Sequence, residues 1–346
     1  MSNELGNLTS DNSPLSIPIS KFSEAEGGGC LPTNCRLLGY ESADQKFSDA
    51  LGSSVLRYVQ ASLAENTKRA YQSDIVAFLK WGGKIPTTAP VVALYLADSA
   101  RSLSISTLQR RLIGLSRAHA ALGWADPVKN EQVRATLRGI RRVHGKPPAQ
   151  AAPLLMGDLL LLVDAIPVSV AGARDRCLLL MGFAAGFRRS ELMSLRVEDV
   201  EFVPEGMLIV LRRSKTDQEG QGRKIGIPFG RTRACAVKAL RQWLETAAIS
   251  EGPLFRSVSK AGRVGSNQMS DQAVNLVLAK CAARAGLSSE RLSGHSLRAG
   301  LVTSAAKAGV SAWKIRQQTG HRSDAMLQRY IRDADIFVGN AAEAIL

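Results

Sequence analysis

Histidine, arginine and tyrosine side chains gather toward the C-terminal end of this sequence. The segment GHSLR places His295 three residues before Arg298, TGH contributes His321, and LQRYI contributes Tyr330. A phenol oxygen that attacks a phosphodiester builds negative charge on the non-bridging oxygens, and the forked donors of arginine bind such charge. These residue types together indicate phosphoryl transfer.

A second arginine and a lysine that fit the same chemistry stand further upstream. The segment GFRRSEL places Arg188 three residues before Glu191, so both side chains share one face of a helix. It continues the apolar run CLLLMGFAAGF, which gives Arg188 a rigid support. Lys215, in RRSKT, stands where a strand meets a polar turn. Taken singly, an Arg–Glu pair of this spacing is usually a surface salt bridge, and a turn lysine is usually solvated.

The reaction assigns a task to each group. Arg188 and Arg298 are the candidates for binding the phosphate oxygens. Histidine has an ordinary pKa near neutrality, so His295 is the candidate base for the phenol proton of Tyr330. The leaving oxygen is a poor alkoxide and needs a proton, which Lys215 can give. The ordinary alternative for Tyr330 is a helical core residue, but an arginine flanks it closely on either side.

The region after residue 153 must supply the elements that hold these groups. Apolar spacing predicts helices at about 155–165 and 172–186. The segment GMLIVLRRSKTDQEGQGRKIGIPFG predicts two strands around a polar turn. From about residue 231 the pattern is helical, with a Gly- and Ser-rich loop at 257–270.

Two local features bring the histidines near the tyrosine. Ser296 is available as a helix cap, so that His295 and Arg298 address one point near a helix start. Nine residues of unbroken helix would separate His321 from Tyr330 by ~13 Å. The Gly before His321 and the Ser-Asp pair after it break the helix, which lets the tyrosine segment fold back.

The preceding region, from about 47 to 144, is helical throughout and predicts a bundle of four or five short helices without strands. In STLQRRLIGLSRAHAALG the residues Leu108, Leu112 and Leu115 share one face. Basic residues cluster off such faces, either as solvated charges or as phosphate contacts. The clusters are Lys68 with Arg69, Arg110 with Arg111, and Arg138 with Arg141 and Arg142.

Charge along the chain favours a polyanionic partner such as nucleic acid. Lys and Arg number 45 against 30 Asp and Glu, a formal net charge of +15. Residues 1–45 hold two basic and six acidic residues and are rich in Ser, Asn, Gly and Pro, which predicts a disordered acidic tail. That tail lacks the basic start and apolar core of a signal peptide.

Apolar runs and cysteines indicate a soluble, reduced protein. No run reaches the ~18 residues of a membrane span, so we expect no membrane association. The five cysteines show no paired C-x-x-C spacing, and Cys177, Cys235 and Cys281 fall in apolar helical patterns. Reduced thiols in a cytoplasm fit best. Cys30 and Cys35 could ligate a metal only together with further ligands, and no histidine is near them in the sequence.

In their order along the chain, these motifs resemble those of the tyrosine recombinases, the phage integrase family, and among them the simple two-domain recombinases of the Cre type. The resemblance covers most of 150–335. Each motif is weak alone, but the ordered set is specific. The matching residues are Arg188, Glu191, Lys215, His295, Arg298, His321 and Tyr330.

The resemblance implies a mainly α fold with a small β-sheet in the C-terminal domain, and a C-shaped clamp on DNA. It suggests a helical core-binding domain of the SAM-like type at 46–143 and a catalytic domain at 154–346. The acidic tail then covers 1–45, and a linker covers 144–153, where Gly, Pro and Ala occur without an apolar period. Within the catalytic domain, a helix at 335–346 would dock into a neighbouring protomer.

The activity implied is site-specific recombination of double-stranded DNA at an inverted-repeat site, by a homotetramer. Tyr330 would form a 3′-phosphotyrosyl link, and strands would exchange through a Holliday junction. Transesterification retains the bond energy, so neither a metal nor ATP nor another cofactor is expected. The location implied is the cytoplasm of a bacterium, at the nucleoid, with the gene on a chromosome, phage or plasmid.

Two other functions share these features. Type IB topoisomerases use similar chemistry but relax DNA as monomers. A non-catalytic DNA-binding regulator could keep the fold, although the full set of active groups in this sequence disfavours it.

Overall fold

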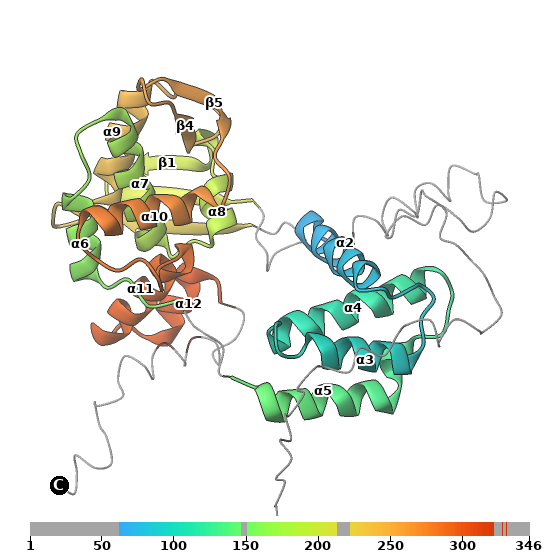
Figure 1. Ribbon diagram of the computed structural model, residues 1–346. Coiled ribbons are helices and arrows are strands. Elements are labelled where there is room, and N and C mark those ends of the chain that lie inside the picture. The colour runs from blue at the N-terminus through green and yellow to red at the C-terminus, as the bar shows by residue number, and fades with distance from the viewer. Residues whose placement is uncertain (1–61, 147–150, 213–221, 322–326, 328–329, 331–346) are drawn as a thin grey trace, which may run out of the picture. The chain divides into compact units, whose positions relative to one another are not determined.

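The computed structural model describes residues 62–146, 151–212, 222–321, 327 and 330. Residues 62–146 belong to one compact unit and the described residues from 151 onward to a second (Figure 1). The tail expected at 1–45 and the helix expected at 335–346 lie outside the described residues. The domain boundaries inferred from the sequence therefore stay a prediction.

Within residues 62–146 the first unit is helical, as expected. Its helices are α2 (Glu65–Lys80), α3 (Ala89–Ser99), α4 (Ile105–Ala121) and α5 (Glu131–His144), with a short 3₁₀ turn at Pro127–Lys129. Ser104 and Asn130 cap α4 and α5 by accepting hydrogen bonds from backbone N–H groups. The helix α2 has Ala64 at its cap position, which supplies no side-chain hydrogen bond to the first turn.

The apolar stripes of these helices meet in one core. Phe78, Tyr95 and Leu96 are buried there together with the predicted leucines of α4. The rings of Phe78 and Tyr95 meet edge to face with centroids 5.0 Å apart, a favourable geometry for aromatic pairs. The periodicity of the sequence therefore identified the core face of α4 correctly.

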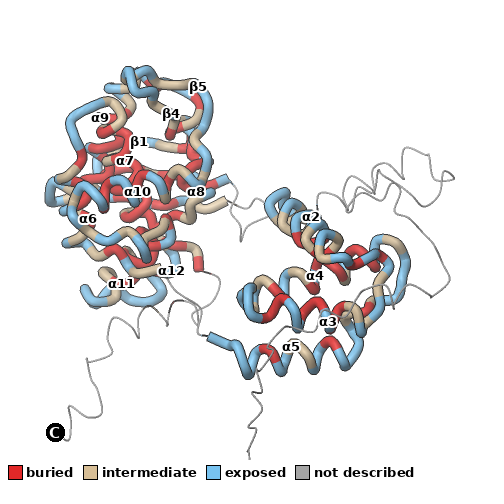
Figure 2. Tube along the Cα trace, viewed as in Figure 1, coloured by how far each residue is buried: buried red, intermediate tan, exposed pale blue. Residues whose placement is uncertain are grey.

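The second unit surrounds one long buried helix. This helix, α7 (Val170–Ala185), includes most of the apolar run expected to be a buried helix, and its residues 177–183 are all buried (Figure 2). It ends at Gly186, whose φ of +60° is favourable only for residues such as glycine. The helices around it are α6 (Met156–Asp164), α8 (Arg189–Ser194), α9 (Ala236–Ala247), α10 (Ala273–Arg284), α11 (Gly294–Lys307) and α12 (Ala312–Thr319).

An antiparallel sheet contributes to the same core. Strands β2 (Gly206–Leu211) and β3 (Arg223–Pro228) pair with Leu211 opposite Arg223, which confirms the two strands predicted around the polar turn. A third strand, β1 (Val200–Val203), pairs with the other edge of β2. It was not predicted, because four residues are too short for a clear alternation.

The segment expected to be a loop at 257–270 is instead largely a hairpin. Strands β4 (Arg256–Val258) and β5 (Val264–Gln268) pair antiparallel, with Val258 opposite Val264. The prediction was wrong because the Gly and Ser residues of this segment dominated its composition, while the pairing depends on contacts across the turn.

The buried cysteines agree with the reduced state expected from the sequence. Cys177, Cys235 and Cys281 are buried free thiols. Burial raises the pKa of the Cys281 thiol to about 11, so it stays protonated near neutral pH. Cys30 and Cys35 lie outside the described residues.

Candidate active site

The start of α11 presents His295 to Tyr330. The cap of this helix is Ser293, whose hydroxyl accepts a hydrogen bond from the backbone of His295, while Ser296 bonds back to the Ser293 backbone N–H. The sequence reading of Ser296 as the cap was wrong, because Ser296 is the third helical residue of a capping box. His295 Nε2 lies 2.6 Å from Tyr330 Oη.

A small apolar cluster holds the tyrosine segment. Leu327 precedes Tyr330 by three residues, is fully buried, and packs with Val302 of α11 and Ile315 of α12. Both Leu327 and Tyr330 are helical. The turn through Gly320, whose φ is +67°, ends α12 immediately before His321. The ring centroid of His321 lies 6.4 Å from that of Tyr330, as the expected fold-back requires.

Arg298 joins three helix ends at the centre of the site. Its side chain is 2 % exposed. One terminal nitrogen donates to the carbonyl of Gly186 at 2.6 Å and to that of Thr319 at 2.7 Å. The other terminal nitrogen is buried and has no hydrogen-bond partner among the described residues. A buried N–H without a partner is costly, so this donor is available for an anion that enters the site.

Arg188 and Glu191 form the pair that the sequence predicts. Arg188 precedes α8, and its guanidinium donates to Glu191 Oε1 at 2.5 Å while its backbone N–H donates to Oε2 at 2.9 Å. Glu191 is 2 % exposed. Arg188 also donates to the Gly320 carbonyl at 3.4 Å, which brings it beside His321. The surface salt bridge considered as the ordinary alternative does not describe this pair, because the carboxylate is buried.

Arg223 is a further cation in the site that the sequence reading missed. It begins β3, and one of its nitrogens lies 3.9 Å from Glu191 Oε2. A signal was present in the sequence, because strand alternation places Arg223 on the same face as Ile225 and Ile227, which are buried. A charged residue in register with core residues on a strand must have a buried partner.

The remaining expected groups are Lys215 and the basic residues of the first unit. Lys215 lies outside the described residues. In the first unit, Arg110 and Arg111 pair with the buried carboxylate of Asp74, at 2.8 Å and 3.8 Å, and Arg111 also binds the Tyr95 hydroxyl. The others make contacts within their own helix or are exposed. Lys68 pairs with Glu65, Arg69 with Asn66 and Arg138 with Glu131, while Arg141 and Arg142 are exposed on the last turn of α5.

The charges of the site lower the pKa values of both histidines. Burial, and then Arg298 and Arg188, lower the pKa of His295 below its usual 6.5, although part of its ring stays open to solvent. The same causes lower the pKa of His321 to about 3. Burial lowers the pKa of Arg298 to about 10, still above neutrality. Near neutral pH both imidazoles are therefore neutral, while Arg298 is charged.

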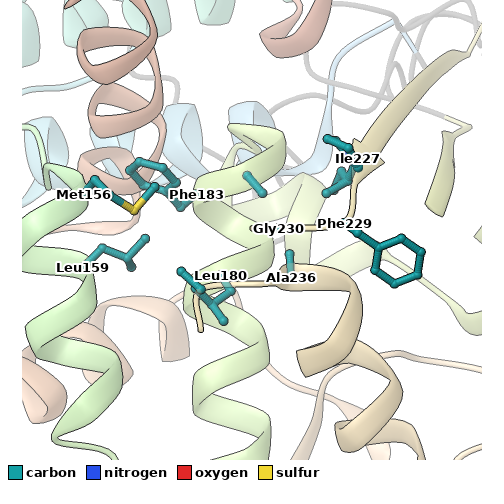
Figure 3. A pocket seen from close by; sticks show the side chains of 11 residues that line it. Met156, Leu159, Leu180, Phe183, Ile227, Phe229, Gly230 and Ala236 are labelled. Carbon is teal, nitrogen blue, oxygen red and sulfur yellow. The ribbon is translucent and has the colours of Figure 1, made fainter. Parts of the chain in front are cut away.

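Two hollows differ in their chemistry. One lies beside the site and is lined by basic and aromatic side chains, among them Lys224, Trp313, Arg316 and His321. The other, between α6, α7 and β3, is lined by apolar groups such as Met156 (Figure 3). The apolar hollow has no titratable side chain in its lining and does not suit phosphate chemistry.

Within the described parts of the chain, no helix is both long enough and apolar enough to cross a membrane. In the same ranges, His, Cys, Asp and Glu side chains form no group of three that could hold a metal ion.

The sequence matches the family model described as "Phage integrase family" over residues 156–335. An integrase/recombinase xerD homolog of Selenomonas ruminantium is 37 % identical over 304 residues, covering 85 % of this chain and 89 % of the relative. The recombinase cre of Escherichia phage P1 is 27 % identical over 284 residues, covering 75 % and 79 %.

Solved structures show the same fold. A XerH site-specific recombinase in a post-cleavage complex with difH matches with a TM-score of 0.61 at 16 % identity, covering 85 % of this chain and 84 % of the other. A lambda integrase tetramer bound to a Holliday junction matches with a TM-score of 0.58 at 20 % identity, covering 91 % and 84 %.

The chain therefore belongs to the phage integrase family, the tyrosine recombinases. It is a site-specific DNA recombinase, an enzyme that transfers DNA strands.

Proposed function

We propose that Tyr330 is the nucleophile of this recombinase and that His295 is its base. The observation that carries this proposal is the 2.6 Å distance from His295 Nε2 to Tyr330 Oη. A neutral imidazole at hydrogen-bond distance can accept the phenol proton. The charges of Arg188 and Arg298 are close enough to the histidines to lower their pKa values. We propose that these two guanidinium groups bind the non-bridging oxygens of the phosphodiester.

The cleavage step then balances without ATP. The bond from Tyr330 Oη to phosphorus forms as the bond from phosphorus to the 5′-oxygen breaks. The phenol proton passes to His295, and Lys215 gives a proton to the departing 5′-oxygen. The products are a 3′-phosphotyrosyl link and a 5′-hydroxyl, and attack by the 5′-hydroxyl of a partner strand reverses the step. Glu191 orients Arg188, and His321 adds a neutral donor beside the phosphate.

The DNA partner proposed is a duplex with an inverted-repeat recombination site. Relatives in the solved structures are bound to DNA, and one of them is a tetramer on a Holliday junction. For this chain we propose a corresponding homotetramer, in which neighbouring protomers exchange the helix at 335–346. Deleting residues 335–346 should leave binding to one half-site intact and remove cooperative pairing on the full site, as a gel-shift titration would measure.

The experiment first selects the half-site from random-sequence duplexes with the full-length chain. The cleavage substrate then carries two inverted copies of the selected half-site around a short asymmetric spacer. A nick in this substrate lets the cleaved end diffuse away, so that the protein stays covalently bound. We expect a covalent band with the wild type, and binding without that band for Tyr330→Phe. Tyr71→Phe is the matched control and should form the band normally. A covalent nucleotide mapped to another residue would overturn the assignment of Tyr330.

The same substrates separate the other two functions. Relaxation of a supercoiled plasmid that lacks the half-site, with no strand exchange, would indicate a topoisomerase. Specific binding with no covalent band from any substrate would indicate a regulator.

A further inference from the structure

Arg223 connects the sheet to the turn that carries His321. Its Nη1 atom donates to the carbonyl of Gln318 at 3.0 Å. The guanidinium also packs against Gly320 so closely that a Cβ at that position would lie 2.3 Å from Nη1. The backbone on either side of the α12 terminus is therefore held by a side chain of β3.

The second terminal nitrogen of Arg223 faces Glu191. Nη2 is buried, has no hydrogen-bond partner among the described residues, and lies 3.9 Å from Glu191 Oε2. Glu191 already binds the guanidinium of Arg188 through its other oxygen. Two arginines thus share one buried carboxylate, and only Arg188 is bonded to it directly. Burial lowers the pKa of Arg223, while the charge of Glu191 opposes that shift.

Arg223 is not the only residue that supports the α12 terminus. The Gln318 side chain donates to the carbonyl of Ala184 at 3.1 Å and to that of Gly226 at 3.4 Å, so the same turn is also tied to α7 and β3. A purely structural arginine would need only its bond to Gln318. The buried Nη2 beside Glu191 is a feature that such a role leaves unexplained.

We infer that Arg223 is a positioning residue for cleavage, which fixes Glu191 and the Gly320 turn so that Arg188 and His321 address the phosphate together. A second cation beside Glu191 balances the carboxylate, so that Arg188 can turn one donor toward DNA without leaving a buried charge unpaired. This inference rests on the proposed function, because it assigns Arg223 to the same phosphate site.

The test compares cleavage rates inside preformed complexes, at saturating protein, on two nicked substrates. One carries the natural phosphodiester at the scissile position, and the other carries a methylphosphonate, which has no charge on its non-bridging atoms. Misplaced phosphate donors should cost between about tenfold and about a hundredfold on the phosphodiester. Arg223→Ala should therefore be slower by that factor there, and by less than about threefold on the faster-cleaved methylphosphonate isomer.

Three variants complete the design. Arg223→Lys keeps the charge without the fork and should recover part of the rate. Arg188→Ala calibrates how much an arginine that binds the phosphate loses on each substrate. Arg212→Ala removes an exposed arginine from the end of β2, where it pairs with Asp199, and should cleave at the wild-type rate once bound. Urea unfolding of each variant identifies any loss of folding.

The outcomes distinguish the inference from the function on which it rests. Equal slowing of Arg223→Ala on both substrates would assign it a structural role and overturn the inference, as would a wild-type rate on the phosphodiester. Absence of covalent product with the wild type itself would instead overturn the proposed function.

Discussion

The Nε2 atom of His295 lies 2.6 Å from the Oη atom of Tyr330, although 35 residues separate the two along the chain. His295 is held by the capped first turn of α11, and Tyr330 is held by the burial of Leu327 against α11 and α12. The pair therefore depends on two packed elements and not on a flexible loop, as a preorganised acid–base contact requires.

The pH dependence of cleavage should report the protonation state of the His295 imidazole. Its pKa lies below 6.5, so the imidazole is a neutral base at pH 7 and becomes protonated only as the pH falls through that lowered value. We expect the second-order rate constant of cleavage, which reports the protein before it binds DNA, to be level from pH 8 to about 6.5 and to fall at lower pH. His295→Gln should be slower by about a hundredfold and lose the acid limb. A decline that begins above pH 7 in the wild type would contradict this assignment.

Replacing Arg298 by lysine should damage both the fold and the chemistry. A lysine cannot donate to the carbonyls of Gly186 and Thr319 and still present a spare forked donor. We expect cleavage to fall by at least about a hundredfold and the free energy of unfolding to fall by about 1–3 kcal/mol, because buried carbonyls lose their partner. Single-turnover cleavage and urea unfolding measure the two effects. Arg284→Lys, at the exposed end of α10, is the control and should change neither quantity.

Truncating Leu327 should separate tyrosine placement from DNA binding. Leu327→Ala removes fully buried methyl groups from the cluster with Val302 and Ile315, and a cavity there loosens the segment that carries Tyr330. We expect cleavage to fall by about tenfold or more while half-site affinity changes by less than about twofold. Leu327→Met, of similar volume, should restore most of the rate. Equal losses of affinity and rate in the alanine variant would show that the cluster supports DNA binding instead.

The arginines of the first unit should divide into structural and DNA-binding groups. Asp74 is buried and accepts two hydrogen bonds from Arg110, so Arg110→Ala should lower the free energy of unfolding by about 1–3 kcal/mol. Arg141→Ala and Arg142→Ala remove exposed charges and should leave stability unchanged. Each should weaken DNA binding and reduce the slope of log affinity against log salt by about 1.

Salt titrations of half-site binding and urea unfolding test this division. A reduced salt slope for Arg110→Ala at unchanged stability would assign Arg110 to phosphate contact, as the sequence pattern alone allowed.

Several local features could be predicted from the sequence because they depend on neighbouring residues. The apolar run of α7 and the leucine stripe of α4 repeat at helical spacing, and the strands of the β2–β3 hairpin flank a polar turn. The chemistry of the site could also be predicted, because few reactions use tyrosine, histidine and arginine side chains together in one site. The ordered motifs then indicated the family.

Only the tertiary structure decided which of these groups meet. In the sequence, Arg110 and Arg141 are equivalent members of basic clusters on helices, yet Arg110 donates to Asp74 of another helix. Arg223 appeared to be an ordinary strand residue until its neighbours Glu191 and Gln318 were in place. A hydrogen bond requires its donor and acceptor within about 3 Å, and helical or strand periodicity specifies only the face on which a side chain lies. The partner on that face comes from packing between elements that are distant in sequence, which no local pattern encodes.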